Sequence, residues 1–126
     1  MNIIVCIKPV LDPDLPQIKF SIDAKKNSVV PPEGMPPVMN PYDAVAVEAA
    51  LQLKDQQKGK VTVITVGDGE NVLRKSLAMG ADEAVVVKAE GVEEYDPFGK
   101  ASLLAQAIRK RGAYDLVLCG RHAADW

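Results

Sequence analysis

Near its start the sequence reads Asn2-Ile3-Ile4-Val5-Cys6-Ile7, an almost unbroken apolar run. A run of this length and composition is typical of a strand buried on both faces, as in a parallel sheet covered by helices. Three similar runs follow, at residues 61–66, 84–87 and 116–119, and helical patterns separate them. This alternation predicts an α/β fold, a Rossmann-like open parallel sheet with helices on both faces.

The predicted helices have recognisable ends. The first begins at Pro41 and stops before Gly59, the second covers residues 70–79, and the third starts at Pro97 and stops at Gly112. Residues 9–37 interrupt the alternation, because residues 18–22 and 28–30 alternate like the two arms of a hairpin around a polar turn at residues 23–27. We therefore expect one domain, residues 1–126, with a small β-hairpin excursion before the first helix.

A second informative stretch, Val38-Met39-Asn40-Pro41-Tyr42-Asp43, opens the first helix. Pro41 suits the first helical position, and Asn40 stands where an N-cap belongs. We expect the Asn40 side chain to accept a hydrogen bond from a first-turn amide and Asp43 to complete a capping box. The other amides of that turn would then face an anion or the polar edge of a ligand. The simpler interpretation is a well-capped helix without a ligand.

Composition excludes several classes of partner. Fifteen Lys and Arg residues against seventeen Asp and Glu residues leave a net charge of −2, and no block of like charge suggests nucleic acid or an anionic membrane surface. No secretory signal and no apolar run of ~20 residues is present, so we expect a cytoplasmic protein without direct membrane insertion. The two cysteines, Cys6 and Cys119, lie in apolar runs without ligand-spaced neighbours, and we expect both thiols to be free and buried.

Topology predicts where a ligand would bind. In open parallel sheets the crevice lies at the carboxyl ends of the strands where strand order reverses, commonly between the first and fourth strands. Four segments should converge there: residues 6–8, the helix start at Asn40, residues 66–67 and the loop from Gly120. A mononucleotide suits such a crevice, and a crevice lined only by loops is the alternative.

Other sequence signals favour no catalysis. Gly67-Asp68-Gly69 lacks the third glycine of a dinucleotide fingerprint and suits a strand-to-helix turn, and no phosphate-binding P-loop is present. The only histidine, His122, is more typical of a solvated or locally bonded side chain than of a catalyst. Lys8 suits either a phosphate or a surface counter-charge. We expect no catalytic residues and no metal site.

Four segments carry a family resemblance. They are residues 3–10, the Asn40-Pro41-Tyr42-Asp43 helix start, Ala78-Met79-Gly80-Ala81-Asp82, and residues 115–125. In order and spacing these resemble the beta subunit of electron-transferring flavoprotein and its nitrogen-fixation relatives, over essentially the whole chain. The resemblance implies a fold like that of adenine nucleotide alpha-hydrolases. The family chain continues for about as many residues again, so we interpret this domain as truncated at its C-terminal end and expect weak nucleotide binding.

The resemblance also implies a role. The beta subunit would bind AMP, or in some relatives a second FAD, and would pair with an alpha subunit that carries a shared, redox-active FAD. The heterodimer would accept electrons from acyl-CoA or other flavin dehydrogenases, and the chain itself would be an electron carrier subunit rather than an enzyme. The implied nucleotide-binding residues are Cys6, Asn40, Pro41, Tyr42, Asp43, Val66, Gly120, Arg121, His122, Ala123, Ala124 and Asp125.

Two points stay open at this stage. The family usually has Gln at the position of His122, and a neutral imidazole can replace one donor or one acceptor of that amide. The alternative function is a universal-stress-like ATP- or AMP-binding regulatory homodimer on the same sheet. That class places a glycine-rich phosphate loop after the fourth strand, whereas residues 120–125 contain one glycine, Gly120.

Overall fold

The computed structural model describes residues 1–16 and 19–125. Its centre is a four-stranded parallel sheet in the order β7-β6-β1-β8. The strands are β1 (Asn2–Cys6), β6 (Lys60–Val66), β7 (Glu83–Val87) and β8 (Leu116–Cys119). The chain adds β6 and β7 on one side of β1 and then returns to add β8 on the other. Strand order therefore reverses between β1 and β8, where the sequence places the crevice.

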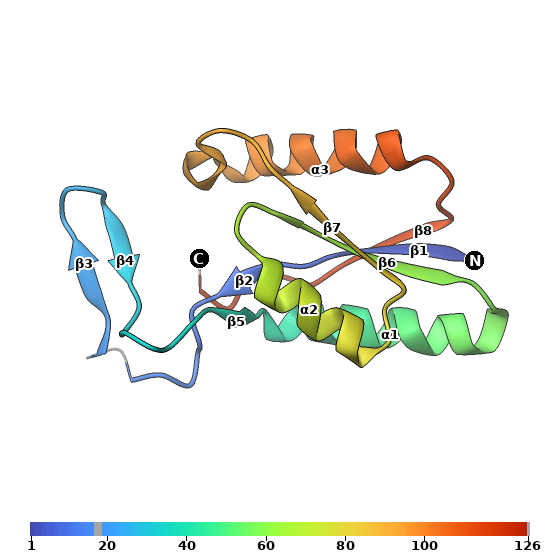
Figure 1. Cartoon of the computed structure of the whole chain (residues 1–126), viewed down its shortest axis with the longest axis horizontal. Helices are drawn as coiled ribbons and strands as arrows, with labels where there is room; N and C mark the ends of the chain where they lie inside the picture. Colours follow the sequence, from blue (N-terminus) through green and yellow to red (C-terminus); the bar gives the residue numbers. More distant parts are fainter. Residues whose placement is uncertain (17–18, 126) are drawn as a thin grey trace.

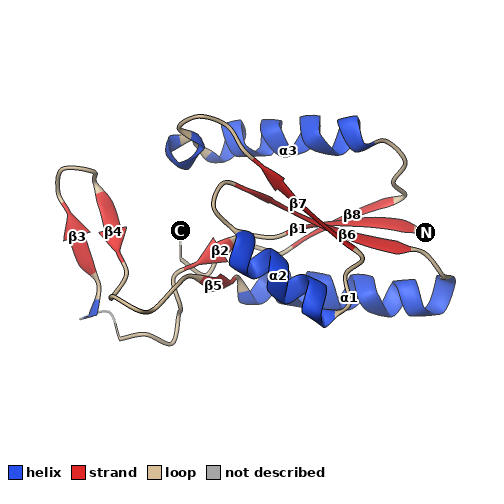
Figure 2. Ribbon diagram, in the orientation of Figure 1, coloured by secondary structure: helices blue, strands red, loops and turns tan. Residues whose placement is uncertain are grey.

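Helices cover both faces of this sheet (Figure 1, Figure 2). Helices α1 (Pro41–Gln57) and α2 (Glu70–Met79) pack on one face, and α3 (Pro97–Arg111) packs on the other. The larger core lies under α1 and α2, where Val5 and Val63 of the sheet meet Val47 of α1. A smaller core under α3 contains Ile4, Ile64 and Ile108. These layers confirm the predicted α/β fold, and the apolar spacing within each helix explains which face it buries.

The hairpin excursion is also confirmed. Strands β3 (Ser21–Asp23) and β4 (Ser28–Val30) pair antiparallel and project from the sheet (Figure 1). The predicted first arm began at Ile18, which lies outside the described residues, and the described strand starts at Ser21. A short 3-10 turn, η2 (Val92–Glu94), precedes α3.

A pairing that the sequence did not predict fixes the start of α1. Strand β2 (Pro9–Val10) follows β1 closely and pairs antiparallel with β5 (Val38–Met39), which leads into α1. The main-chain N–H of Asn40 continues this ladder by donating to the oxygen of Lys8 at 3.0 Å. The helix start is thereby attached to the carboxyl end of β1.

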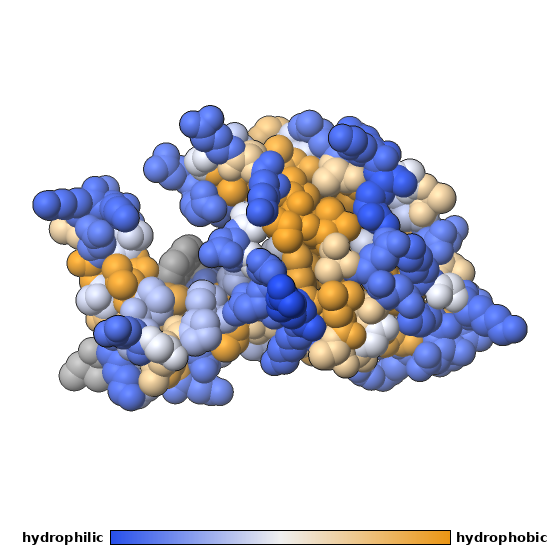
Figure 3. Space-filling view, in the orientation of Figure 1, coloured by the Kyte–Doolittle hydropathy of each residue, from blue (hydrophilic) through white to orange (hydrophobic). Residues whose placement is uncertain are grey.

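Cover on the α3 side of the sheet is uneven. Because α3 packs on β6 and β7, the edge strand β8 leaves Val117 and Cys119 exposed. The prediction that both thiols are buried is therefore wrong for Cys119, since an edge strand beyond the helix keeps one face open, and Cys6 is only half-buried. At the opposite edge, Figure 3 shows apolar side chains gathered where β7 lies between α2 and α3.

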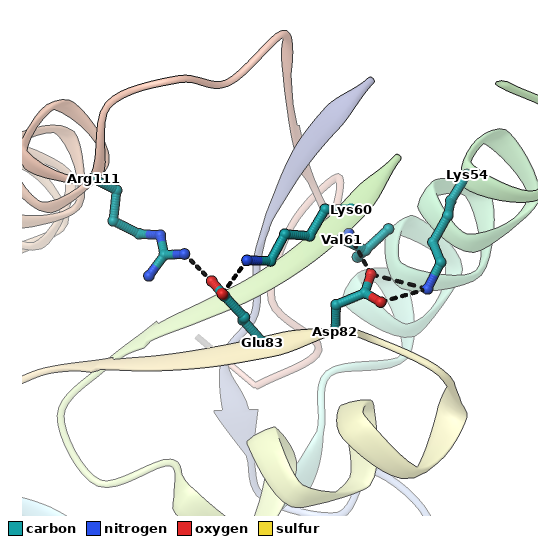
Figure 4. A network of polar contacts seen from close by, with 6 residues as sticks. All are labelled: Lys54, Lys60, Val61, Asp82, Glu83 and Arg111. Carbon is teal, nitrogen blue, oxygen red and sulfur yellow. Dashed lines mark hydrogen bonds and ion pairs between the residues drawn. The ribbon is translucent and has the colours of Figure 1, made fainter. Parts of the chain in front are cut away.

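The Ala78-Met79-Gly80-Ala81-Asp82 segment has a structural role at the amino ends of the strands, away from the crevice (Figure 4). Asp82 accepts the N–H of Val61 at 2.8 Å and pairs with Lys54 of α1 at 2.9 Å. Its neighbour Glu83 pairs with both Lys60 and Arg111. These contacts join α1, α3, β6 and β7 at the amino ends of the strands.

Candidate functional site

The four segments predicted to converge do meet at the carboxyl ends of the strands. A cavity of about 220 Å³ lies between the ends of β1 and β8. Its lining comprises Cys6, Ile7, Lys8, Asn40, Asp43, Leu104, Cys119, Gly120, His122 and Ala123. A second cavity of about 330 Å³ shares Ile7, Lys8 and Leu104 with the first and extends over the end of β6 to Val66 and Gly67. The two together form one crevice, and the larger falls in the size range of small-molecule sites.

Asn40 organises this crevice, but not as a cap. Its side chain makes no capping hydrogen bond, so the predicted N-cap bond is wrong. Instead, Nδ2 donates to the main-chain oxygen of His122 at 2.8 Å, and Oδ1 accepts the N–H of Ala124 at 3.1 Å. Asn40 is 2 % exposed. A buried amide with both ends bonded to one loop fixes that loop against the start of α1.

Asp43 does not complete a capping box either. Its Oδ2 accepts the main-chain N–H of Lys8 at 2.7 Å, and the main chain of Gly120 and the side chain of Asn40 also contact it. Burial raises the pKa of the Asp43 carboxyl above its ordinary value, and the hydrogen bond from Lys8 opposes that rise. The carboxylate therefore joins the ends of β1 and β8 to α1, a long-range role that local capping rules do not anticipate.

Gly120 is required by this close approach. A Cβ built at Gly120 would lie 2.1 Å from Oδ1 of Asp43 and 2.8 Å from the Asp43 nitrogen. Since the nitrogen belongs to the backbone, it has no rotamer by which to avoid the contact. The glycine lets the chain leave β8 directly against the first turn of α1.

Two side-chain pairs border the loop. The ring of His122 lies 4.1 Å from that of Tyr42, with the planes tilted by 47°. Lys8 Nζ pairs with Asp125 Oδ1 at 2.8 Å, which supports the counter-charge interpretation of Lys8. Both pairs connect the loop after β8 to elements that precede it by more than 75 residues.

The sequence of the chain matches a known protein family. A sequence model of the electron transfer flavoprotein domain matches residues 29–125. The chain belongs to the electron transfer flavoprotein family. The match includes the start of α1 and the loop after β8, so the crevice lies within the family domain apart from the end of β1.

Relatives of known name cover nearly the whole chain. It is 40% identical to the electron transfer flavoprotein subunit beta of Megasphaera elsdenii, over 99% of this chain and 48% of that protein. Protein FixA of Azorhizobium caulinodans is 41% identical over 99% of this chain and 45% of its own length. The caffeyl-CoA reductase-Etf complex subunit CarD of Acetobacterium woodii is 42% identical over 99% and 47%. The chain therefore spans about half the length of the curated relatives it matches.

The implied family site residues do not all lie in one place. Cys6, Asn40, Asp43, Gly120, His122 and Ala123 line the smaller cavity, and Val66 lines the larger. Pro41 and Tyr42 are exposed on the first turn of α1, and Arg121 is exposed in the loop. Ala124 and Asp125 face a separate cavity toward the hairpin. The electron transfer flavoprotein resemblance thus names residues of a shared region, of which seven line the crevice.

Sequence reasoning missed the contribution of α3. Leu104 lines both cavities, and Lys100 lines the larger one. Leu104 belongs to α3, a helix that the sequence predicts, but periodicity alone gives no sign that this residue faces a crevice. Lys100 lies one turn after the helix start at Asp96-Pro97, and that start is near the carboxyl edge of the sheet. This position is the sequence signal that could have placed Lys100 near the crevice.

The described residues form neither a metal-binding cluster nor a membrane-spanning helix. Within residues 1–16 and 19–125, no group of three or more His, Cys, Asp and Glu side chains is arranged to hold a metal ion. Among the helices of that same part of the chain, none has the length and apolar character needed to cross a bilayer.

Proposed function

We propose that this chain forms the nucleotide-binding part of an electron transfer flavoprotein beta subunit, with the crevice between β1 and β8 as the site of an adenine nucleotide. The observation that carries the proposal is the double hydrogen bond of Asn40 to the loop after β8. It holds that loop over the cavity at the strand-order reversal, where open α/β sheets bind ligands.

The residues of the crevice suit such a ligand. Apolar side chains at Ile7, Val66 and Leu104 offer a surface for a purine ring. Lys100 supplies a positive charge at its margin, where Asp68 and Glu93 also lie. Thr65 also lines the larger cavity, but its hydroxyl is buried beneath Gly69, just before α2, and is not accessible to a ligand.

The nucleotide is AMP or the adenine portion of a second FAD. The resemblance allows both, and the crevice residues bind what the two share. We infer that the chain orients the adenine and shields it from water, since apolar side chains of the sheet and of α3 line the crevice. The redox chemistry is supplied by FAD, most of it held by a partner alpha subunit.

The proposal extends to assembly. Relatives are named as subunits, among them the acryloyl-CoA reductase electron transfer subunit gamma of Anaerotignum propionicum. We infer that this protein pairs with an FAD-carrying alpha subunit in the cytoplasm and receives electrons from acyl-CoA or other flavin dehydrogenases. The family match does not favour the universal-stress-like regulator, and the single glycine of the loop after β8 is a second argument against it.

Co-expression of this chain with the electron transfer flavoprotein alpha subunit of a relative would test the proposal. The purified complex is denatured, and the released nucleotides are identified by chromatography and mass spectrometry. We expect FAD together with either AMP or a second equivalent of FAD. A matched complex that carries Asn40→Asp should lose the AMP or the second FAD and keep the first. A colourless homodimer with bound ATP would contradict the proposal.

A further inference from the structure

Cys6 and Cys119 form a pair of thiols inside the crevice. They are register partners on the neighbouring parallel strands β1 and β8. Register partners in a parallel pair point to the same face, and both cysteines line the smaller cavity. Both are free thiols, and each contacts the other closely enough for a hydrogen bond between them.

Geometry favours an ion between these sulfurs over a disulfide. Neighbouring strands lie about 4.8 Å apart, and register partners hold their Cα–Cβ bonds parallel, so the two Cβ atoms keep roughly that separation. A disulfide needs a Cβ–Cβ distance of about 3.8 Å. Direct oxidation would therefore have to draw two hydrogen-bonded strands together by about 1 Å. A metal ion between the sulfurs inserts two metal–sulfur bonds into the gap, so the two strands can keep their spacing.

The number of ligands selects the kind of ion. Thiolates prefer soft ions, and Cu⁺ binds stably to two of them. Structural Zn²⁺ takes four ligands, and the described residues offer no cluster of three or more. Asp43 is near Cys6, but a carboxylate is a hard ligand better suited to Mg²⁺ or Ca²⁺.

We propose that Cys6 and Cys119 form a two-thiolate binding site for Cu⁺ at the wall of the crevice. Binding breaks two S–H bonds, forms two Cu–S bonds and releases two protons to solvent, and no electron is transferred. Because Cys119 is exposed, the ion can reach the two sulfurs from solvent at that residue.

A competition titration with the coloured Cu⁺–bicinchoninate complex tests the site. Under anaerobic, reducing conditions the wild-type protein should remove one Cu⁺ per chain and release two protons, measured with a pH indicator. Cys6→Ser and Cys119→Ser should each weaken uptake by roughly 100-fold. Met35→Leu is the matched control, because it removes an exposed soft sulfur that lines neither cavity, and it should bind as the wild type does. Wild-type uptake that survives in Cys119→Ser would overturn the proposal.

A second measurement needs no variant. One equivalent of Cu⁺ should protect Cys119 of the wild-type protein from iodoacetamide, as read by mass spectrometry, while one equivalent of Zn²⁺ should not. Unchanged alkylation with Cu⁺ would refute the site even if the serine variants misfold. Resting on the proposed function, we also expect saturating AMP to reduce Cu⁺ uptake, because both would occupy the crevice. Cu⁺ uptake that is unchanged by saturating AMP would count against the nucleotide position and would leave the thiol site supported.

Discussion

Asn40 and His122, 82 positions apart, are joined by a 2.8 Å hydrogen bond from the side-chain amide of the first to the main-chain oxygen of the second. This bond, with its counterpart to Ala124, makes Asn40 a bridge between α1 and the loop after β8. A capping residue would serve α1 alone. The two roles respond differently to substitution.

The Asn40 bridge predicts that Asp cannot replace Asn. Aspartate is as good an N-cap as asparagine, but it has no N–H to donate to His122 and would place a second carboxylate beside Asp43. Asn40→Ala should lower the free energy of unfolding by about 1–3 kcal/mol, and Asn40→Asp should lower it at least as much. Urea unfolding at neutral pH measures both.

Asp96 provides the matched control for this comparison. Its Oδ1 accepts the N–H of Gly99 at 2.7 Å, which is a true N-cap of α3. Asp96→Asn should be nearly neutral, and Asp96→Ala should cost about 1 kcal/mol. If Asn40→Asp were as mild as Asp96→Asn, Asn40 would be a cap and the bridge would not matter to stability.

Gly120 should tolerate no side chain. Gly120→Ala places a Cβ against the backbone of Asp43, so α1 and β8 would have to separate. The control is Gly34→Ala, where no atom lies within 4 Å but φ is +76°, and strain alone should cost about 1–2 kcal/mol. We expect the loss in Gly120→Ala to exceed this value in urea unfolding. Equal losses in the two variants would show that the close approach is easily relieved.

Asp82, at the amino ends of the strands, should make the free energy of unfolding depend on pH. The N–H of Val61, followed by Lys54, lowers the pKa of the Asp82 carboxyl below its ordinary value. Its contribution is therefore present above the unfolded-state pKa of about 3.9 and is lost as pH falls through the lower, folded-state pKa. Asp82→Asn keeps an acceptor for Val61 and should cost about 0.2–1 kcal/mol at pH 7.

The comparison of wild type with Asp82→Asn across pH checks this sign. The difference in unfolding free energy should be constant near neutrality and should shrink below about pH 4. Asp82→Ala, which also leaves the Val61 N–H without an acceptor, should be the more damaging change at every pH. A difference that grew as pH fell would mean that the carboxylate is not stabilised by its partners.

The fold was largely predictable because its signals are local. The apolar runs at β1 and β8, the Pro41 and Pro97 helix starts, and the Gly80 helix stop each depend on a few neighbouring residues. The hairpin was recognisable for the same reason. The two-residue pairing of β2 with β5 and the short turn η2 escaped, since elements of that length leave no periodicity in sequence.

The site was predictable in place but not in detail. Strand order alone located the crevice, but Asp43 accepts a hydrogen bond from Lys8, 35 positions away, and Asn40 bonds the loop after β8, more than 80 positions away. Local rules gave both residues a capping role, and long-range contacts replaced it. The exposure of Cys119 was missed because its run is apolar, while its position at a sheet edge depends on the extent of α3.

The two thiols should differ in reactivity. Cys119 is exposed and should be alkylated quickly in the native protein, while burial raises the pKa of Cys6 to about 12 and should make it slow. Peptide mapping after brief treatment with iodoacetamide separates the two sites. Both should react at similar rates in denaturant. Equal alkylation rates in the native protein would contradict the packing of Cys6 against β8 and α3.

If adenine nucleotides occupy the crevice between β1 and β8, an NMR titration of the ¹⁵N-labelled chain with AMP should both detect the binding, even when it is weak, and locate it. We expect saturable shifts at the amides of Lys8, Asn40, Gly67 and residues 120–125. The amide of Asp82, at the amino ends of the strands, should be unaffected, and the shifts should be reduced in Asn40→Asp. Shifts centred elsewhere, or none at millimolar AMP, would contradict it.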